Sequence, residues 1–151
     1  APIRKLDQPE IGWYELETTE HGREDEVLSP LQGGAPVFQW HSYGFELPSG
    51  ARHLARTEGW APQAFRAGDK AYGFQFHIEM DASLIERWLA TPAYRAELTQ
   101  SGLAHDEHGI RAATVTRIDR MQQQADAVFN RFLDLIGTPQ RRQALPSREW
   151  V

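Results

Sequence analysis

The sequence of 151 residues contains no cysteine. This absence excludes a disulfide framework, and it also excludes a cysteine nucleophile within the chain itself. No apolar run approaches the roughly 18 residues of a membrane span, and no secretory signal opens the sequence, so we expect a cytoplasmic protein without membrane contact. Acidic residues (21) outnumber basic ones (16), and the resulting net charge of −5 argues against a nucleic-acid partner.

Short segments rich in branched and aromatic residues occupy the first half of the chain, whereas helical patterns occupy the second. Strands are expected at 11–17, 37–41, 52–57, 63–66 and 71–78. A size of 17.2 kDa is typical of one domain.

Helix is expected after Asp81, with a break near Pro92. A long amphipathic helix should follow, with an apolar stripe from Ile110 to Leu135 and an end at Gly137. The last residues have no such periodicity. The pattern therefore predicts one domain over residues 1–137 and a tail over residues 138–151.

The stretch "AYGFQFHIEMD", residues 71–81, places ionisable groups in an apolar strand. Side chains alternate along a strand, so His77 and Glu79 should share one face while Phe76 and Ile78 point to the other. A buried polar pair is costly unless it is satisfied or used. A structural pair within the sheet and a working pair in a cleft are both compatible with this pattern.

Three segments, "EIGWYEL", "FQWHSYGFELPSGARHLA" and "PQAFRAGDKAYGFQFHIE", occur in an order that resembles class I glutamine amidotransferase domains. The resemblance is strongest to the stand-alone branch that is similar to the amidotransferase domain of GMP synthase. It covers about residues 10 to 89 and concerns only the C-terminal half of the domain. It implies an α/β, flavodoxin-like fold, here its second half, with short mixed strands followed by C-terminal helices.

The family hydrolyses the side-chain amide of glutamine to glutamate and ammonia through a Cys-His-Glu triad. By resemblance, His77 is the general acid and base and Glu79 is the residue that orients it. Ile78 stands between them where many relatives have proline, and it faces away. The residues that match the loop lining the family's glutamine pocket are Trp40, Ser42, Tyr43 and Gly44.

The family's nucleophile lies in a G-x-C-x-G segment, and this sequence has none. The resemblance therefore implies a chain that is inactive alone and requires a missing N-terminal half, or a companion chain, to supply the cysteine. A half-domain of this kind would expose apolar surface, so a homo-oligomer is also open. No metal or organic cofactor is implied.

Two alternative functions remain open. A γ-glutamyl peptide or amine hydrolase would use the same triad on a different leaving group. A non-catalytic binding or regulatory half-domain would keep the fold without the nucleophile. The segment "HDEH" at 105–108 has metal-ligand residue types, but acidic residues that start a helix are its ordinary explanation.

Overall fold

The computed structural model describes residues 1–58, 62–103 and 106–137. Its centre is a five-stranded sheet with the order β2-β1-β3-β4-β5, and all strand pairings within these residues are antiparallel. The strands are β1 (Ile3–Thr18), β2 (Ala35–Phe45), β3 (Arg52–Arg56), β4 (Pro62–Ala67) and β5 (Ala71–Phe74). The expected α/β class, with strands followed by helices, is confirmed.

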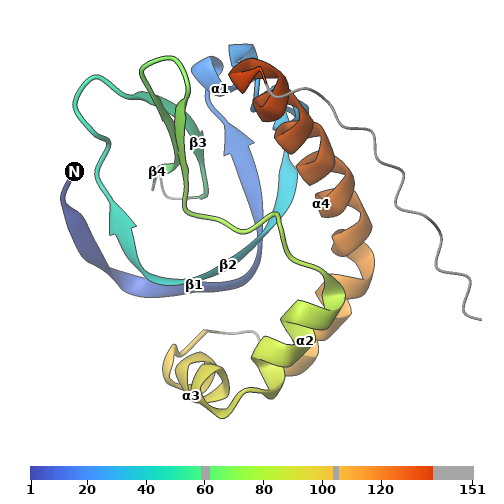
Figure 1. Ribbon diagram of the computed structural model, residues 1–151. Helices are drawn as coiled ribbons and strands as arrows, with labels where there is room; N and C mark the ends of the chain where they lie inside the picture. The colour runs from blue at the N-terminus through green and yellow to red at the C-terminus, as the bar shows by residue number, and fades with distance from the viewer. Residues whose placement is uncertain (59–61, 104–105, 138–151) are drawn as a thin grey trace, which may run out of the picture.

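Strands β1 and β2 form a long curved pair that sweeps around one side of the molecule (Figure 1). Their register shifts between Lys5 and Glu10, and an irregularity of this kind bends a strand and increases its twist. Both strands are longer than the segments 11–17 and 37–41 that the sequence predicts. The apolar pattern marks only the more buried part of each strand, which is the second half of β1 and the first half of β2.

Two short elements connect β1 to β2: the helix α1 (Glu20–Glu24) and the 3-10 turn η1 (Ser29–Leu31). The Thr19 hydroxyl oxygen caps α1 by accepting a hydrogen bond from the backbone nitrogen of Gly22 at 3.1 Å. A Cβ atom added at Gly22 would lie 1.9 Å from the carbonyl oxygen of Leu54. Only glycine therefore lets α1 approach β3 this closely.

One isolated pair of backbone hydrogen bonds closes the curled sheet. The amide of Phe38, in β2, donates to the carbonyl oxygen of His77 at 3.0 Å, and the amide of His77 donates to the carbonyl oxygen of Phe38 at 2.8 Å. Strand β2 is one edge of the sheet, and His77 follows β5, which is the other edge. The bridge therefore joins the two edges, and the side chain of Phe38 is fully buried beside it.

The helices α2 (Ala82–Ala90) and α3 (Pro92–Gln100) lie at one end of the sheet (Figure 1). The carboxylate of Asp81 caps α2 by accepting from the backbone nitrogen of Leu84 at 2.7 Å. Pro92 begins α3, which confirms the expected break.

The long helix α4 (Glu107–Ile136) runs alongside the sheet (Figure 1). It ends at Gly137, which adopts the left-handed conformation with φ of 76° and serves as the C-cap, as the sequence predicts. The indole nitrogen of Trp13 in β1 donates to the hydroxyl of Thr114 at 2.9 Å and ties the helix to the sheet. The buried stripe of α4 consists of Ile110, Thr114, Met121, Ala125 and Val128.

None of the helices in the described residues has an apolar stretch long enough to cross a membrane. The proposed tail, residues 138–151, lies outside the described residues.

The buried position of Phe38 gives a direct test of this packing. Phe38→Ala is expected to lower the free energy of unfolding by about 3–5 kcal/mol, because it removes a fully buried aromatic ring and leaves a cavity. Val115→Ala is the control, since that side chain on α4 is 80 % exposed and its truncation should change stability by less than about 0.5 kcal/mol. Urea denaturation measures both, and equal losses would contradict the assigned core.

Candidate active site

The side chains of His77 and Glu79 meet directly. Nδ1 of His77 lies 2.7 Å from Oε1 of Glu79, and Oε2 of the same carboxylate accepts from the backbone nitrogen of Ile78 at 3.0 Å. Both carboxylate oxygens are therefore held. The exposed fractions of the two side chains are 29 % for His77 and 53 % for Glu79, so the pair lies at the surface and not in the core.

The backbone that carries this pair is not the continuous strand expected over 71–78. Strand β5 ends at Phe74, and the amide of Gln75 still donates to the carbonyl oxygen of Gln63 in β4 at 2.8 Å. The chain then leaves β4 and bridges to β2 at His77. The expected alternation of side chains survives this crossing, because Phe76 and Ile78 are buried while Glu79 is exposed.

The hydrogen bond fixes the protonation of the imidazole ring. An ionised carboxylate only accepts hydrogen bonds, so Nδ1 of His77 must carry the hydrogen that Glu79 accepts. In the neutral ring, Nε2 is then the unprotonated nitrogen. The hydrogen bond from His77 also lowers the pKa of Glu79 below its ordinary value of 4.5, against the opposing effect of partial burial. This arrangement suits a base whose proton acceptor is Nε2.

The four residues expected in a substrate-binding loop lie instead within strand β2. Trp40 is only 8 % exposed, and its indole nitrogen donates to Oε2 of Glu97 at 2.9 Å. Ser42 makes a longer hydrogen bond, 3.5 Å, from its hydroxyl to Oε1 of Glu97. Tyr43 is 56 % exposed, and a Cβ atom at Gly44 would lie 2.9 Å from Leu6.

Glu97, on α3, is thus the shared partner of two candidate residues, and sequence reasoning missed it. The sequence signal was weak, because α3 has no clear apolar stripe and Glu97 reads as one more polar helix residue. The carboxylate links the end of β2 to α3.

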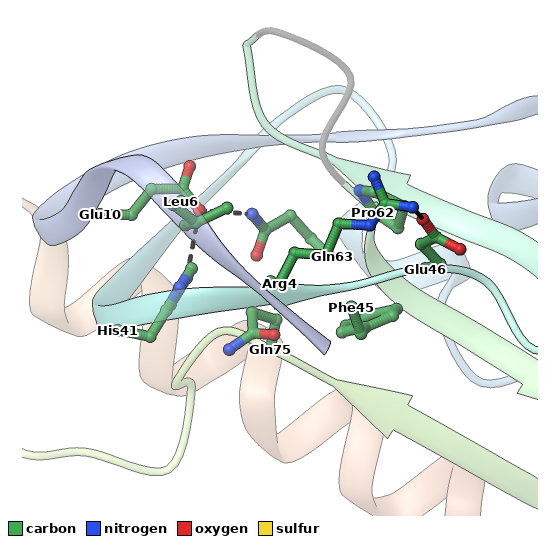
Figure 2. A pocket seen from close by; sticks show the side chains of 10 residues that line it. Arg4, Leu6, Glu10, His41, Phe45, Glu46, Pro62, Gln63 and Gln75 are labelled. Carbon is green, nitrogen blue, oxygen red and sulfur yellow. Dashed lines mark hydrogen bonds and ion pairs between the residues drawn. The ribbon is translucent and has the colours of Figure 1, made fainter. Parts of the chain in front are cut away.

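A cavity of about 150 Å³ lies beside the C-terminal end of β2 (Figure 2). Glu10 and His41 stand at one end of it, and the ion pair of Arg4 with Glu46 stands at the other (Figure 2). Of the candidate substrate residues, the cavity includes only Gly44. His77 and Glu79 are not among its lining residues, so it is distinct from the candidate pair.

The polar end of this cavity is a buried network. Nε2 of His41 lies 3.1 Å from Oε2 of Glu10, which also accepts from the amide nitrogen of Gln63 at 2.6 Å, while Oε1 accepts from the hydroxyl of Thr57 at 2.7 Å. Burial acts to raise the pKa of Glu10, but the hydrogen bonds from His41, Thr57 and Gln63 together lower it below 4.5. His41 is therefore bound into this network through Nε2, whereas its Nδ1 is buried and has no hydrogen-bond partner among the described residues.

No group of three or more histidine, aspartate or glutamate side chains in the described residues is arranged to hold a metal ion. His105, in the "HDEH" segment, lies outside the described residues. Asp106 from the same segment serves as the N-cap of α4 and accepts from the backbone nitrogen of Gly109 at 2.9 Å.

Comparison with known proteins finds several that are similar to this chain. The glutamine amidotransferase-like protein YfeJ of Salmonella typhimurium is 28 % identical over 134 residues, which are 89 % of this chain and 54 % of that protein. The chain is homologous to glutamine amidotransferase-like proteins. No protein-family model matches it.

Two solved structures are similar to this chain. The glutamine amidotransferase of Methylobacillus flagellatus superposes with a TM-score of 0.76 at 27 % identity, over 89 % of this chain and 55 % of that one. A GMP synthase subunit from Thermoplasma acidophilum has a TM-score of 0.52 at 16 % identity, over 89 % of this chain and 48 % of that one, which shows a shared fold. The chain spans about half the length of these glutamine amidotransferase-like relatives.

The pKa of Glu79 provides a test of the pair. The carboxylate should titrate below 4.5 in the folded chain, and His77→Ala should raise that midpoint toward 4.5 because the main stabilising hydrogen bond is lost. His21→Ala, an exposed change on α1, should leave it unchanged. Carbon-13 NMR of the glutamate carboxyl groups measures the shift.

The same pKa makes a prediction about stability. The folded-state pKa is depressed, so the pair's contribution is fully present above about pH 4.5 and is lost as the pH falls through the lower folded value. Any stability advantage of the native chain over Glu79→Gln should therefore disappear at acid pH. An advantage that grew on acidification would contradict the assigned hydrogen bond.

Proposed function

We propose that this chain supplies the histidine and glutamate of a glutamine amidotransferase site, which hydrolyses the side-chain amide of glutamine to glutamate and ammonia. The observation that carries the proposal is the contact of 2.7 Å between Nδ1 of His77 and Oε1 of Glu79, which leaves Nε2 as the proton acceptor. The homology to glutamine amidotransferase-like proteins supports the choice of reaction.

In the proposed reaction, a cysteine thiol from outside this chain loses its proton to Nε2 of His77 as the sulfur attacks the amide carbon of glutamine. The carbon–nitrogen bond breaks, and the imidazolium returns the proton to the departing nitrogen, which leaves as ammonia. Water then attacks the glutamyl thioester, releasing glutamate and the thiol. Glu79 stabilises the imidazolium and keeps the ring in the required tautomer.

The cysteine must come from elsewhere because this sequence contains none. We place it on a further half-domain, either in the same polypeptide or on a companion chain. The half-length match to the relatives supports this arrangement. Without such a partner, the chain would not hydrolyse glutamine through a thioester.

The proposed glutamine pocket lies along the C-terminal end of β2. The contacts of its four residues indicate a different role for each. Ser42 and Tyr43 are accessible enough to touch the substrate, whereas Trp40 is buried and its indole nitrogen is already bonded to Glu97. Trp40 would therefore form a supporting wall. Gly44 would act through its backbone, since Leu6 occupies the space that a side chain would need.

The reaction is tested on the native-length gene product that contains this chain, by measuring ammonia release from glutamine. His77→Ala should lower kcat/KM on the order of 10⁴-fold or more, because the proton acceptor is lost. His21→Ala, which removes an exposed histidine on α1, is the matched control and should retain full activity. Undiminished activity in His77→Ala would overturn the assigned role.

The absence of cysteine favours one alternative, a non-catalytic regulatory half-domain. A native-length product that also lacks a cysteine nucleophile and releases no ammonia from glutamine would support this alternative and contradict the enzyme proposal.

A further inference from the structure

The hydrogen bond to Glu79 fixes one atom of the His77 ring, but it does not by itself fix the plane of the ring. A ring held only at Nδ1 can still tilt about that contact, and Nε2 then sweeps through different directions. A base contributes fully only when its nitrogen stays within reach of the proton it removes. The orientation of Nε2 therefore requires a second contact on the ring.

Trp88, on α2, supplies that contact. The ring of His77 lies 5.4 Å from the ring of Trp88, centroid to centroid, with an angle of 88° between the planes. This perpendicular arrangement is one of the favoured geometries for aromatic pairs. Rotation of the imidazole away from its present plane would break the contact with Trp88.

Trp88 is itself held on two further sides. It stacks on Tyr94 of α3 at 5.1 Å with 24° between the planes, and it packs perpendicular to Trp40 of β2 at 5.8 Å. Because Trp40 lies in the sheet and Tyr94 lies in α3, the indole of Trp88 is wedged between two elements. These aromatic contacts limit the positions that the partly exposed indole can take.

The helix that carries Trp88 is also held at its first turn and at its middle. Asp81, two residues after Glu79, caps its first turn. Glu86 then forms a two-pronged ion pair with Arg111 of α4, with distances of 2.8 and 2.9 Å. Helix α2 is thereby anchored to α4 close to Trp88.

We propose that Trp88 is a positioning residue that sets the plane of the His77 ring and so the direction of Nε2. This inference rests on the proposed function, because a set direction of Nε2 matters only if that nitrogen moves a proton. Trp88 touches His77 and not the reacting atoms, so it acts through the histidine alone.

The test reads the tautomer of His77 on the whole chain, with nitrogen-15 NMR of the imidazole at about pH 9, where histidine rings are neutral. His77→Gln assigns the signal among the six histidines. The native chain should show the form with hydrogen on Nδ1. Residual dipolar couplings of the imidazole C–H bonds then report the orientation of the ring. Trp88→Leu, which keeps an apolar side chain but no flat ring, should change these couplings while Glu79 still holds the hydrogen on Nδ1, and Trp88→Phe should restore them.

Trp13→Phe is the matched control. Trp13 belongs to the same aromatic cluster, since it packs against Phe38 at 5.5 Å, but the structure places it in contact with Thr114 and not with the His77 ring. This change should leave the imidazole C–H couplings of His77 as in the native chain. Urea denaturation of both variants shows whether a change in ring orientation follows stability alone.

The outcomes separate the two proposals. A native chain without the Nδ1–H form would refute the His77–Glu79 pair and the proposed function with it. Imidazole C–H couplings that Trp88→Leu leaves unchanged, beside a native Nδ1–H form, would overturn the positioning role alone. In the active native-length product, Trp88→Leu should lower kcat about 10- to 100-fold with KM changed by less than about twofold.

Discussion

The backbone hydrogen bonds between Phe38 and His77 are the constraint on which the candidate site depends. They join a strand at one edge of the sheet to the segment that follows the other edge. That closure takes His77 away from β4 and places its ring against α2. The chemistry of the pair is local, two residues apart in sequence, but its position in space is set by contacts that span the chain.

The His41–Glu10 and His77–Glu79 pairs have the same chemical groups but different surroundings. The side chains of His41 and Glu10 are only 11 % and 14 % exposed, and Gln63 and Thr57 also donate hydrogen bonds to the carboxylate. His77 and Glu79 lie at the surface with the imidazole bonded only through Nδ1 in the described residues. The carboxylate of the first pair is satisfied within the protein, whereas Nδ1 of His41 is buried and has no hydrogen-bond partner among the described residues. The second leaves a nitrogen available for chemistry.

Much of this could be predicted from the sequence because it depends on local patterns. The helix caps at Asp81 and Gly137 and the break at Pro92 follow from residue types that act within one turn. The pairing of His77 with Glu79 follows from alternation along an extended backbone. Each of these features needs only neighbouring residues.

The features that could not be predicted come from distant segments. The end of β5 at Phe74 results from the crossing to β2, and nothing near Phe74 in sequence marks it. The placement of Ser42 in a strand follows from pairing of β2 with the polar start of β1. Glu97 and Trp88 gain their roles only when α2 and α3 pack against β2. Periodicity within one segment carries no information about such contacts.

Amide hydrogen exchange of Phe38 and His77 tests the central claim most directly. If closure of the sheet holds the candidate site, both amides should exchange only through global unfolding, with protection equal to that of the buried centre of β2. The two should also lose protection together as denaturant is added. Rapid exchange of His77 while the centre of β2 stays protected would mean that the bridge opens on its own, and it would contradict the account.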